Sequence, residues 1–393
     1  MLLNMKKKKI KIGFIINYRL DGWLGVTNYY KNLFEAISQE NKKDIEVNIL
    51  TDFFMTKKEE EKFKELRIIK SNLFNRKSRI IKIFNLFSIL IFGKNFFVEN
   101  FLKKNHISII SHTNYLGKNS IIPSIKWFPD FQELKYPKNF SFKQKMARKF
   151  DIYLSSIHAT RVLLSSKSVQ KDLKKINIKA YKNSAVVYHT TYLNKKIKIT
   201  NFYKLKKKYN IKKKFFYLPN HFWKHKNHLV VFKAIKKLKE VKKDFCLVTT
   251  GNSYDYRFPN HFTELKFYIK KEKLNNNILY LGIVPVNDVF SLVKNSLALI
   301  NPSFFEGWGN TLEHAINLKK IAIVSNIDVH RERISKNKFL FNPNDYKNLS
   351  KIMLNVINKK INLKKIKINK NDNYLFNKFG KNYFKLIKKT INL

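Results

Sequence analysis

The sequence predicts an α/β protein with two doubly wound parallel-sheet domains. Three observations support this class. Short apolar runs alternate with segments of helical periodicity along most of the 393 residues, which is the pattern of βαβ units. The alternation stops in the Lys-rich stretch 193–214 and then starts again. Polar or Gly-rich loops follow several of the apolar runs. Such loops would lie at the carboxyl ends of the strands, which is where open parallel sheets bind ligands.

The composition restricts the class of protein. A hydrophobic content of 44% is enough for sizeable cores and excludes a disordered chain. The single cysteine, Cys246, excludes a disulfide framework. The 80 basic and 27 acidic residues give a net charge of +53, which makes a polyanion-binding protein the competing class.

The basic residues are nearly all Lys, with only nine Arg, and are spread along the entire chain. The chain is also rich in Asn, Ile and Phe. Codon bias accounts for this composition, so no specific nucleic-acid partner is expected. The same positive surface would still attract an acidic membrane surface.

The apolar segments are those of a protein that does not cross a membrane. The run Ile10 to Ile16 is interrupted by Lys11 and is typical of a strand, not of a secretory signal. The longest uncharged run, Ile83 to Gly93, is shorter than the roughly 20 residues needed to span a bilayer. The sequence predicts a cytoplasmic protein that is at most peripheral at the inner face of the membrane.

The first predicted domain opens with a βαβ unit. A strand over Lys9 to Asn17 is followed by a turn at Gly22 and Gly25, a helix from Thr27 to Ser38, and a strand from Glu46 to Leu50. The two glycines either let the backbone approach a ligand or form a plain tight turn.

A helix over Ser78 to Phe97 is basic at its start and then strongly apolar. We expect its apolar side to face the core. The alternative is a helix that inserts this side into a membrane surface. The residues on that side are Ile80, Ile83, Phe84, Phe87, Leu90 and Ile91.

A second polar group follows in the same domain. The strand Ile107 to Ser111 ends at His112, and Asp130 and Glu133 lie in an aromatic and Pro-containing loop that begins at Trp127. Asp130 and Glu133 form a carboxylate pair that His112 can lie beside, and His112 and Asp130 are candidate catalytic residues. Equally, Asp130 simply caps the segment that follows it.

The second predicted domain repeats the alternation from residue 201 to 372. Its strands are expected at Phe215 to Leu218, Phe245 to Thr250, Ile278 to Leu281, Leu297 to Ile300 and Ile321 to Val324. Helices are expected at His228 to Val241, Phe262 to Lys273, Val286 to Lys294 and Thr311 to Leu318.

Two loops of this domain carry the residues of interest. The first, 219–228, has a Lys- and His-rich sequence before a helix, which suits a phosphate. Metal binding by its histidines is disfavoured because neighbouring lysines repel cations. The second loop places Glu306 before two glycines. Asn310 and Glu313 have the spacing of a capping box.

These residues together resemble the family 4 glycosyltransferases, which have the GT-B fold. Glu306-Gly307-Trp308-Gly309 matches the family's E-G-[FW]-G signature. The segment 220–228 and the segment Trp127 to Gln132 resemble a mannosyltransferase-like subgroup. Where the family has a second glutamate, this chain has His314, with Glu313 one residue earlier. His221 stands at the position of a family arginine, five residues before Lys226.

The resemblance implies residue roles. Glu306 would contact the donor sugar, and it joins Asp130 and His112, already named for their residue types, as a candidate catalytic residue. Donor-binding residues would be His221, Lys226, Gly282, Ile283, Gly307, Trp308, Gly309, Asn310, Thr311, Glu313 and His314. The resemblance implies an acceptor-binding domain over residues 1–200, a nucleotide-sugar domain over 201–372, and a helix in 373–393 that crosses back to the first domain.

The implied activity is transfer of a hexose from a nucleotide diphosphate sugar to a glycan or lipid-linked acceptor, with retention, in cell-surface polysaccharide or lipopolysaccharide synthesis. No metal and no other cofactor is expected, because Lys226, His221 and helix amides offset the diphosphate charge. The subgroup segment that Trp127 to Gln132 matches ends in a histidine, where this chain has Glu133. The departures at His314 and Glu133 leave a non-catalytic GT-B protein as an alternative.

Overall fold

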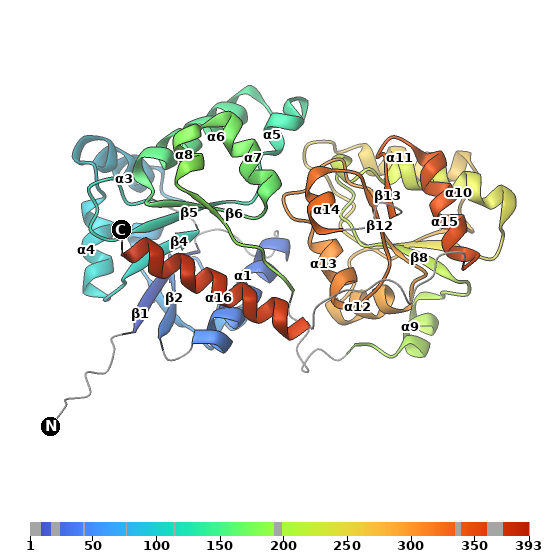
Figure 1. Cartoon of the computed structure of the whole chain (residues 1–393), viewed down its shortest axis with the longest axis horizontal. Helices are drawn as coiled ribbons and strands as arrows, with labels where there is room; N and C mark the ends of the chain where they lie inside the picture. The colour runs from blue at the N-terminus through green and yellow to red at the C-terminus, as the bar shows by residue number, and fades with distance from the viewer. Residues whose placement is uncertain are drawn as a thin grey trace. The chain divides into compact units, whose positions relative to one another are not determined.

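The computed structural model describes residues 9–16, 24–41, 44–75, 77–112, 115–191, 199–334, 339–359 and 372–392. The chain forms two compact units (Figure 1). The first contains Met1–Thr190 and Asn373–Leu393, and the second contains Thr191–Asp372. The sequence places the division at residue 200.

The first unit is built on a seven-stranded parallel sheet with the order β3-β2-β1-β4-β5-β6-β7. The order reverses direction at β1, as in doubly wound folds. The strands are β1 (Ile10–Ile15), β2 (Ile45–Thr51), β3 (Arg67–Lys70), β4 (Ile109–His112), β5 (Ser124–Phe128), β6 (Arg161–Leu164) and β7 (Ser184–Val186).

Adjacent residues of β1 supply the two faces of this sheet. The Ile15 side chain joins a cluster with Val98 and Leu102 of α4 (Phe96–Lys104). The Phe14 ring faces the opposite way and packs edge-on against Phe34 of α1 (Leu24–Asn41). Four more helices connect the later strands of this sheet. Between β5 and β6 the chain forms α5 (Gln132–Lys135) and α6 (Phe142–His158), and between β6 and β7 it forms α7 (Lys167–Ile176) and α8 (Ile178–Lys182).

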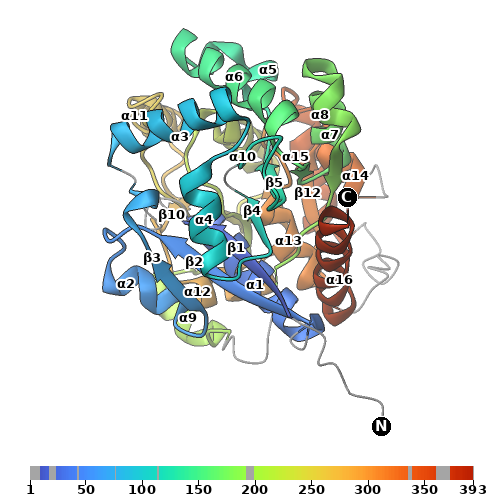
Figure 2. The same cartoon turned by 90° about the vertical axis from the view of Figure 1, so that its left-hand side faces the viewer.

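The last helix, α16 (Asp372–Ile391), packs on the first unit, as Figures 1 and 2 show. Its Tyr383 is fully buried, and the hydroxyl donates to Ser111 Oγ of β4 at 2.8 Å. The Tyr383 ring also lies over Phe14, with centroids 6.4 Å apart. The return of the C-terminal helix to the first unit is therefore confirmed.

The second unit has a six-stranded parallel sheet with the order β10-β9-β8-β11-β12-β13. Its strands are β8 (Phe215–Leu218), β9 (Cys246–Thr249), β10 (Ile278–Tyr280), β11 (Leu299–Asn301), β12 (Ala322–Ser325) and β13 (Leu340–Phe341). Its helices are α9 (Phe202–Tyr209), α10 (His228–Val241), α11 (His261–Lys271), α12 (Val286–Asn295), α13 (Asn310–Asn317), α14 (Asp328–Arg333) and α15 (Tyr346–Ile357).

Alternate residues of β8 again point to opposite faces of the sheet. Phe216 and Leu218 pack with α10, α11 and α15. Phe215 and Tyr217 pack with α9, α12 and α13. Both faces are thus covered, as a buried parallel sheet requires. Two parallel-sheet α/β units were predicted, and this architecture is confirmed.

Two local predictions are wrong. The segment 78–97 is two helices, α3 (Arg79–Phe92) and α4, because Gly93 takes a left-handed φ of 68° and ends the first helix. Its apolar side does not face the core. The side chains expected there are 53–79% exposed: Ile80, Ile83, Phe84, Phe87, Leu90 and Ile91.

The start of α1 also differs from the prediction. Gly25 lies in the first turn of α1, so that helix begins before Thr27. Gly22 lies outside the described residues.

No single helix in the described part of the chain is long and apolar enough to cross a membrane, although the pair α3 and α4, bent by 99°, passes the same test of length and composition together.

Candidate functional site

The candidate site lies at the carboxyl ends of β8, β11 and β12, which are neighbours in the second sheet. The loop after β8 and the loop after β11 are joined directly. Phe304 N donates to His225 O at 2.8 Å, and Asn227 Nδ2 donates to Pro302 O at 3.2 Å. The strand order therefore brings together two segments about 80 residues apart, a proximity that a parallel sheet produces through its crossovers.

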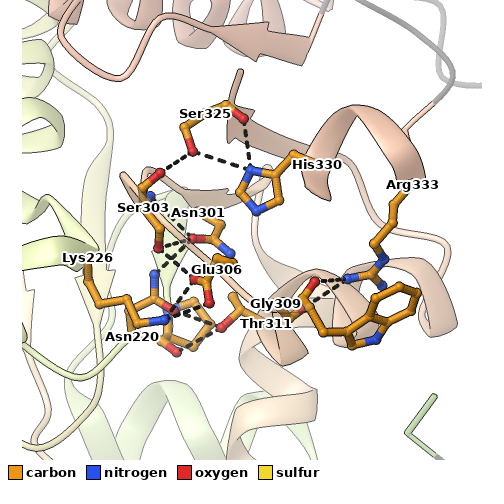
Figure 3. A network of polar contacts seen from close by, with 12 residues as sticks. Asn220, Lys226, Asn301, Ser303, Glu306, Gly309, Thr311, Ser325, His330 and Arg333 are labelled. Atoms are coloured by element: carbon orange, nitrogen blue, oxygen red, sulfur yellow. Dashed lines mark hydrogen bonds and ion pairs between the residues drawn. The ribbon is translucent and has the colours of Figure 1, made fainter. Parts of the chain in front are cut away.

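The centre of the site is an ion pair between Lys226 and Glu306. The Lys226 ammonium donates to both carboxylate oxygens, at 2.7 and 2.8 Å, and both side chains are largely buried. Ser303 Oγ donates to Glu306 Oε1 at 2.7 Å. Figure 3 shows the ammonium pointing at the carboxylate from the facing loop.

The contacts with Lys226 and Ser303 determine the charge of Glu306. Burial by itself would raise the pKa of the carboxyl group. The attraction of Lys226 and the hydrogen bonds from Lys226 and Ser303 outweigh it and hold the pKa at about 2. Glu306 is therefore a carboxylate at neutral pH and can accept hydrogen bonds from sugar hydroxyls.

An amide network positions the loop beneath the ion pair. Asn220 Nδ2 donates to Asn301 Oδ1 at 3.2 Å, and Thr311 Oγ1 donates to Asn220 Oδ1 at 2.8 Å. Asn301 is fully buried at the end of β11. Asn220 thereby connects the end of β8 both to the end of β11 and to the first turn of α13, and the two loops hold a single arrangement.

The turn before α13 depends on Gly309, which has a φ of 84° and is the residue before the helix. Its carbonyl oxygen and that of Trp308 accept from Arg333 Nη1, at 3.0 and 2.7 Å. Arg333 Nη2 donates to Glu313 Oε1. The guanidinium group also lies 4.1 Å from the centre of the Trp308 ring.

The capping box expected from Asn310 and Glu313 is absent. Asn310 is the first helical residue, and the cap position belongs to Gly309, which has no side chain. Glu313 instead forms a buried ion pair with Arg333. Burial lowers the pKa of Arg333 to about 9, so its charge and that of Glu313 compensate each other at neutral pH.

His314 is turned toward α12. Its ring packs edge-on against Phe290, with centroids 5.1 Å apart. Burial lowers the pKa of His314 to about 4, so the ring is neutral at pH 7. The residue at the position of the second family glutamate therefore carries no charge.

His221 is also neutral. The backbone amide of Asn252 donates to its Nδ1 at 2.8 Å, and burial, reinforced by the charge of Lys226, lowers its pKa. An Nδ1 that accepts a hydrogen bond carries no proton, so the hydrogen of the neutral ring is on Nε2. Of these two residues, Lys226 carries a positive charge and His221 does not.

Gly282 and Ile283 lie at the end of β10. Gly282 has a φ of 69° and no atom within 4 Å of where a Cβ would stand. Its carbonyl oxygen accepts from Gly251 N at 2.8 Å, while the Ile283 side chain is exposed. The two residues form an open apolar edge beside the loop that follows β9.

In the first unit, His112 is enclosed by aromatic rings. Tyr29 hydroxyl lies 2.7 Å from its Nε2, and Ser111 Oγ lies 2.8 Å from its Nδ1. The Trp127 ring stacks on Tyr29 at a centroid distance of 4.4 Å. Burial lowers the pKa of His112 to about 3. The ring is therefore neutral. The backbone of His112 has an unusual φ of 82°, and such a conformation is often found at functional sites.

Asp130 and Glu133 share a different partner. Arg148 of α6 lies 2.8 Å from Glu133 Oε2 and 3.6 Å from Asp130 Oδ1. Asp130 Oδ1 also accepts from Gln132 N at 3.3 Å, as in an Asx-turn. The described contacts thus place Asp130 with Arg148 and place His112 with Tyr29 and Ser111. Within the described residues, no group of three or more His, Cys, Asp or Glu is arranged to hold a metal ion.

Sequence patterns gave no individual role to five residues that shape the site: Asn220, Asn301, Ser303, His330 and Arg333. His330 is fully buried, and its Nδ1 donates to Ser325 O at 2.8 Å. The hydrogen on Nδ1 leaves a lone pair on Nε2, which lies 3.6 Å from the position that a Cβ on Gly309 would take. A buried polar residue at the end of an apolar strand was the available signal for Asn301.

Buried neutral histidines predict sensitivity to acid. Burial lowers the pKa of His228 to about 3, below the usual value near 6.5. Protons then bind the unfolded chain first, so the stabilisation is complete above pH 6.5 and is lost as the pH falls toward 3. We expect His228 to lower the free energy of unfolding of the second unit by about 2 kcal/mol between pH 7 and pH 5.

Urea unfolding of the wild type and of His228→Phe at both pH values measures this effect. The new ring would replace one that stacks on Phe222 at 4.1 Å. An equal loss of stability on acidification in the two proteins would contradict the assignment.

Comparison with known proteins identifies the domain. The family model for glycosyl transferases group 1 matches residues 201–372. The second unit is therefore similar to the glycosyltransferase group 1 domain over these residues. This domain contains the whole network around Lys226 and Glu306, and the match supports the glycosyltransferase class of enzyme.

A curated relative is similar to both parts of the chain. The O-antigen chain mannosyltransferase RfbU of Salmonella typhimurium is 26% identical over 257 residues, which is 65% of this chain and 66% of the relative. The matched region thus spans just under two thirds of that relative's length.

Solved structures extend the fold over nearly the whole chain. A Rickettsia africae glycosyltransferase has a TM-score of 0.68 at 19% identity and covers 98% of this chain and 99% of its own. Anabaena HepE, in complex with UDP and glucose, has a TM-score of 0.68 at 14% identity, with coverage of 97% and 100%. The lipopolysaccharide outer core galactosyltransferase WaaB has 0.61 at 15%, with coverage of 97% and 99%. The two units together have the GT-B fold.

Proposed function

We propose that this chain transfers a hexose from a nucleotide diphosphate sugar to a glycan or lipid-linked acceptor, in the synthesis of a cell-surface polysaccharide or lipopolysaccharide. The observation that carries the proposal is the buried Lys226–Glu306 pair at the carboxyl edge of the second sheet. An ammonium for phosphate and a carboxylate for sugar hydroxyls lie in hydrogen-bonding contact there. The curated O-antigen relative supports the choice of pathway class.

In the proposed binding mode, Lys226 contacts the diphosphate of the donor and Glu306 contacts its sugar. The diphosphate would attract the Lys226 ammonium and accept hydrogen bonds from the amides at the start of α13. Nε2–H of His221 would contribute a neutral donor. Glu306, still charged because its pKa is about 2, would then accept from hydroxyls of the sugar. We propose that this set offsets the developing charge of the leaving diphosphate without a metal ion.

We further propose that the anomeric configuration is retained. The acceptor hydroxyl would attack the anomeric carbon from the face that the diphosphate leaves, and its proton would pass to a phosphate oxygen. The first unit would hold the acceptor, with His112 and Asp130 as candidate contacts. Reaction at the cytoplasmic side of the membrane accords with a nucleotide-sugar donor.

The experiment is a thermal-shift screen with UDP-, GDP-, ADP- and dTDP-sugars. At a ligand concentration of 100 times Kd, we expect one donor to stabilise the second unit by about 2.7 kcal/mol, which raises Tm by roughly 5–10 °C. A chelator is expected to leave the shift unchanged. The control is Lys237→Ala on the exposed surface of α10, which removes one positive charge away from the site and should keep the shift.

A second candidate function is that of a non-catalytic nucleotide-sugar binder. It is favoured by one observation: of the two residues at and beside the position of the second family glutamate, Glu313 is engaged by Arg333 and His314 packs on Phe290. A selective thermal shift without transfer to lipid-linked or free glycan acceptors would favour this function. Absence of any shift with all four donors would contradict both.

A further inference from the structure

The first unit has an extended apolar surface formed by α3 and α4. We call it the α3–α4 face, and its exposed members are Ile80, Ile83, Phe84, Phe87, Leu90, Ile91, Phe92, Phe96 and Phe97. The rings of Phe84 and Phe97 are in contact across the two helices, with centroids 5.5 Å apart. Single exposed apolar residues are ordinary, but a continuous set of this kind marks an interaction site.

The opposite side of the same helices holds them on the sheet. Ser88 and Ile89 of α3 are buried, and Val98 and Leu102 of α4 lie in the core beside β1 and β4. Ser88 Oγ donates to Lys94 O at 2.9 Å across the bend. The helices are thus fixed in an orientation that leaves the apolar face uncovered.

The geometry favours a helix pair that lies on a bilayer surface over one that crosses it. The 14 residues of α3 span about 21 Å at 1.5 Å per residue, less than the roughly 30 Å of a hydrocarbon core. The 99° angle between α3 and α4, visible in Figure 2, prevents the two from forming one straight span. One face of the pair can insert to the depth of the acyl boundary while the other stays on the protein.

The charge around the face selects an acidic partner. Residues 67–98 contain seven basic residues and no acidic one. Two of the seven face carboxylates from outside this range: Lys70 pairs with Glu60, and Lys94 lies 3.9 Å from Glu99. Arg79 and Lys82 are exposed on the first turn of α3, among the apolar residues. Lys94 lies 4.4 Å from the centre of the Phe96 ring. Each basic residue near an anionic bilayer strengthens binding about fivefold.

We propose that the α3–α4 face docks the protein on an anionic lipid bilayer, with the apolar side chains in the acyl boundary and Arg79, Lys82 and Lys94 at the headgroups. This surface is separate from the nucleotide-sugar site, which lies in the other unit. The docking would hold the first unit at the surface where a lipid-linked acceptor resides.

Flotation of the full chain with vesicles tests the proposal. Vesicles of phosphatidylcholine alone are compared with vesicles that also contain phosphatidylglycerol. We expect binding to the anionic vesicles, weakened by high salt because salt screens the charges. Ile83→Asp with Phe87→Asp should lower the partition coefficient roughly tenfold or more. The matched control is Phe267→Asp, at an exposed apolar residue of α11 in the other unit.

The variants are first compared with the wild type by thermal unfolding and by the nucleotide-sugar shift, which should both be unchanged. Arg79→Glu with Lys82→Glu should lower binding to anionic vesicles and leave the weaker binding to neutral ones. Equal binding of the wild type to both vesicle types, or unchanged binding of the Asp variant, would overturn the proposal. So would a dimer in light scattering that Phe87→Asp dissociates while no vesicle is bound, since the face would then contact a second copy of the chain.

Discussion

Replacement of Lys226 by Met is expected to lower the free energy of unfolding of the second unit by about 3–5 kcal/mol and to abolish sugar transfer. The variant leaves Glu306 charged and buried with one remaining neutral donor, Ser303. The depression of the Glu306 pKa gives a similar magnitude. A fall from 4.5 to about 2 corresponds to roughly 3 kcal/mol, present above pH 4.5 and lost as the pH falls through 2.

The double variant Lys226→Met with Glu306→Gln separates stability from function. It removes both charges, so we expect most of the lost stability to return, because a buried ion pair is worth little compared with a neutral pair of similar shape. Transfer and the nucleotide-sugar shift should stay absent. Lys237→Met, on the exposed face of α10, is the single-charge control and should change neither property.

Urea unfolding and a transfer assay with the donor selected by the thermal shift measure both effects. Full turnover by the double variant would show that neither residue takes part in the reaction. Failure of the double variant to recover stability would instead show that the two charges do not compensate each other in the folded protein.

Replacement of Arg333 by Met is expected to cost about 3–5 kcal/mol of stability and to remove the nucleotide-sugar shift. The variant leaves Glu313 buried without its ion-pair partner and leaves the carbonyl oxygens of Trp308 and Gly309 without the donor that holds them. The turn at the start of α13 would lose its fixed conformation. Donor binding depends on that turn in the proposed function.

Arg331→Met is the matched control because Arg331 lies on the same helix but is exposed. Its ion pair with Asp328 is half-exposed, so a loss of at most about 1 kcal/mol is expected. Arg333→Lys keeps the charge without the forked geometry and should recover only part of the stability. Equal stability of the Arg331 and Arg333 variants in urea would contradict the structural role of Arg333.

Sequence patterns located the centre of the candidate site because its residues follow strands. Lys226 and Glu306 each lie a few residues after an apolar run, β8 and β11, and parallel strands place such loops at one edge of a sheet. Gly309 before α13 was also noted in the sequence, in the Gly-rich turn after Glu306. The structure explains the need for glycine there, because a φ of 84° favours this residue. Their assignment to donor binding stays a prediction until the nucleotide-sugar experiment is done.

The partners of charged side chains were not visible in the sequence. Glu313 has the spacing of a capping box, yet it binds Arg333, twenty residues away and on another helix. Asp130 and Glu133 were expected as a carboxylate pair, and the sequence did not indicate that Arg148 of α6 contacts both. The spacing of residues in the sequence predicts contacts within one turn or helix. The contacts of Glu313 and of Asp130 with arginines join different elements, which only tertiary packing brings together.

The sequence by itself determined two parallel-sheet α/β units, because apolar runs and helical periodicity are local consequences of backbone geometry. It also determined the apolar side of α3, since the spacing of Ile80, Ile83 and Phe87 is set by the helical repeat. Only the tertiary structure decided that this side is uncovered. Periodicity gives the direction of a face, but what lies against that face depends on where the sheet and the other helices pack.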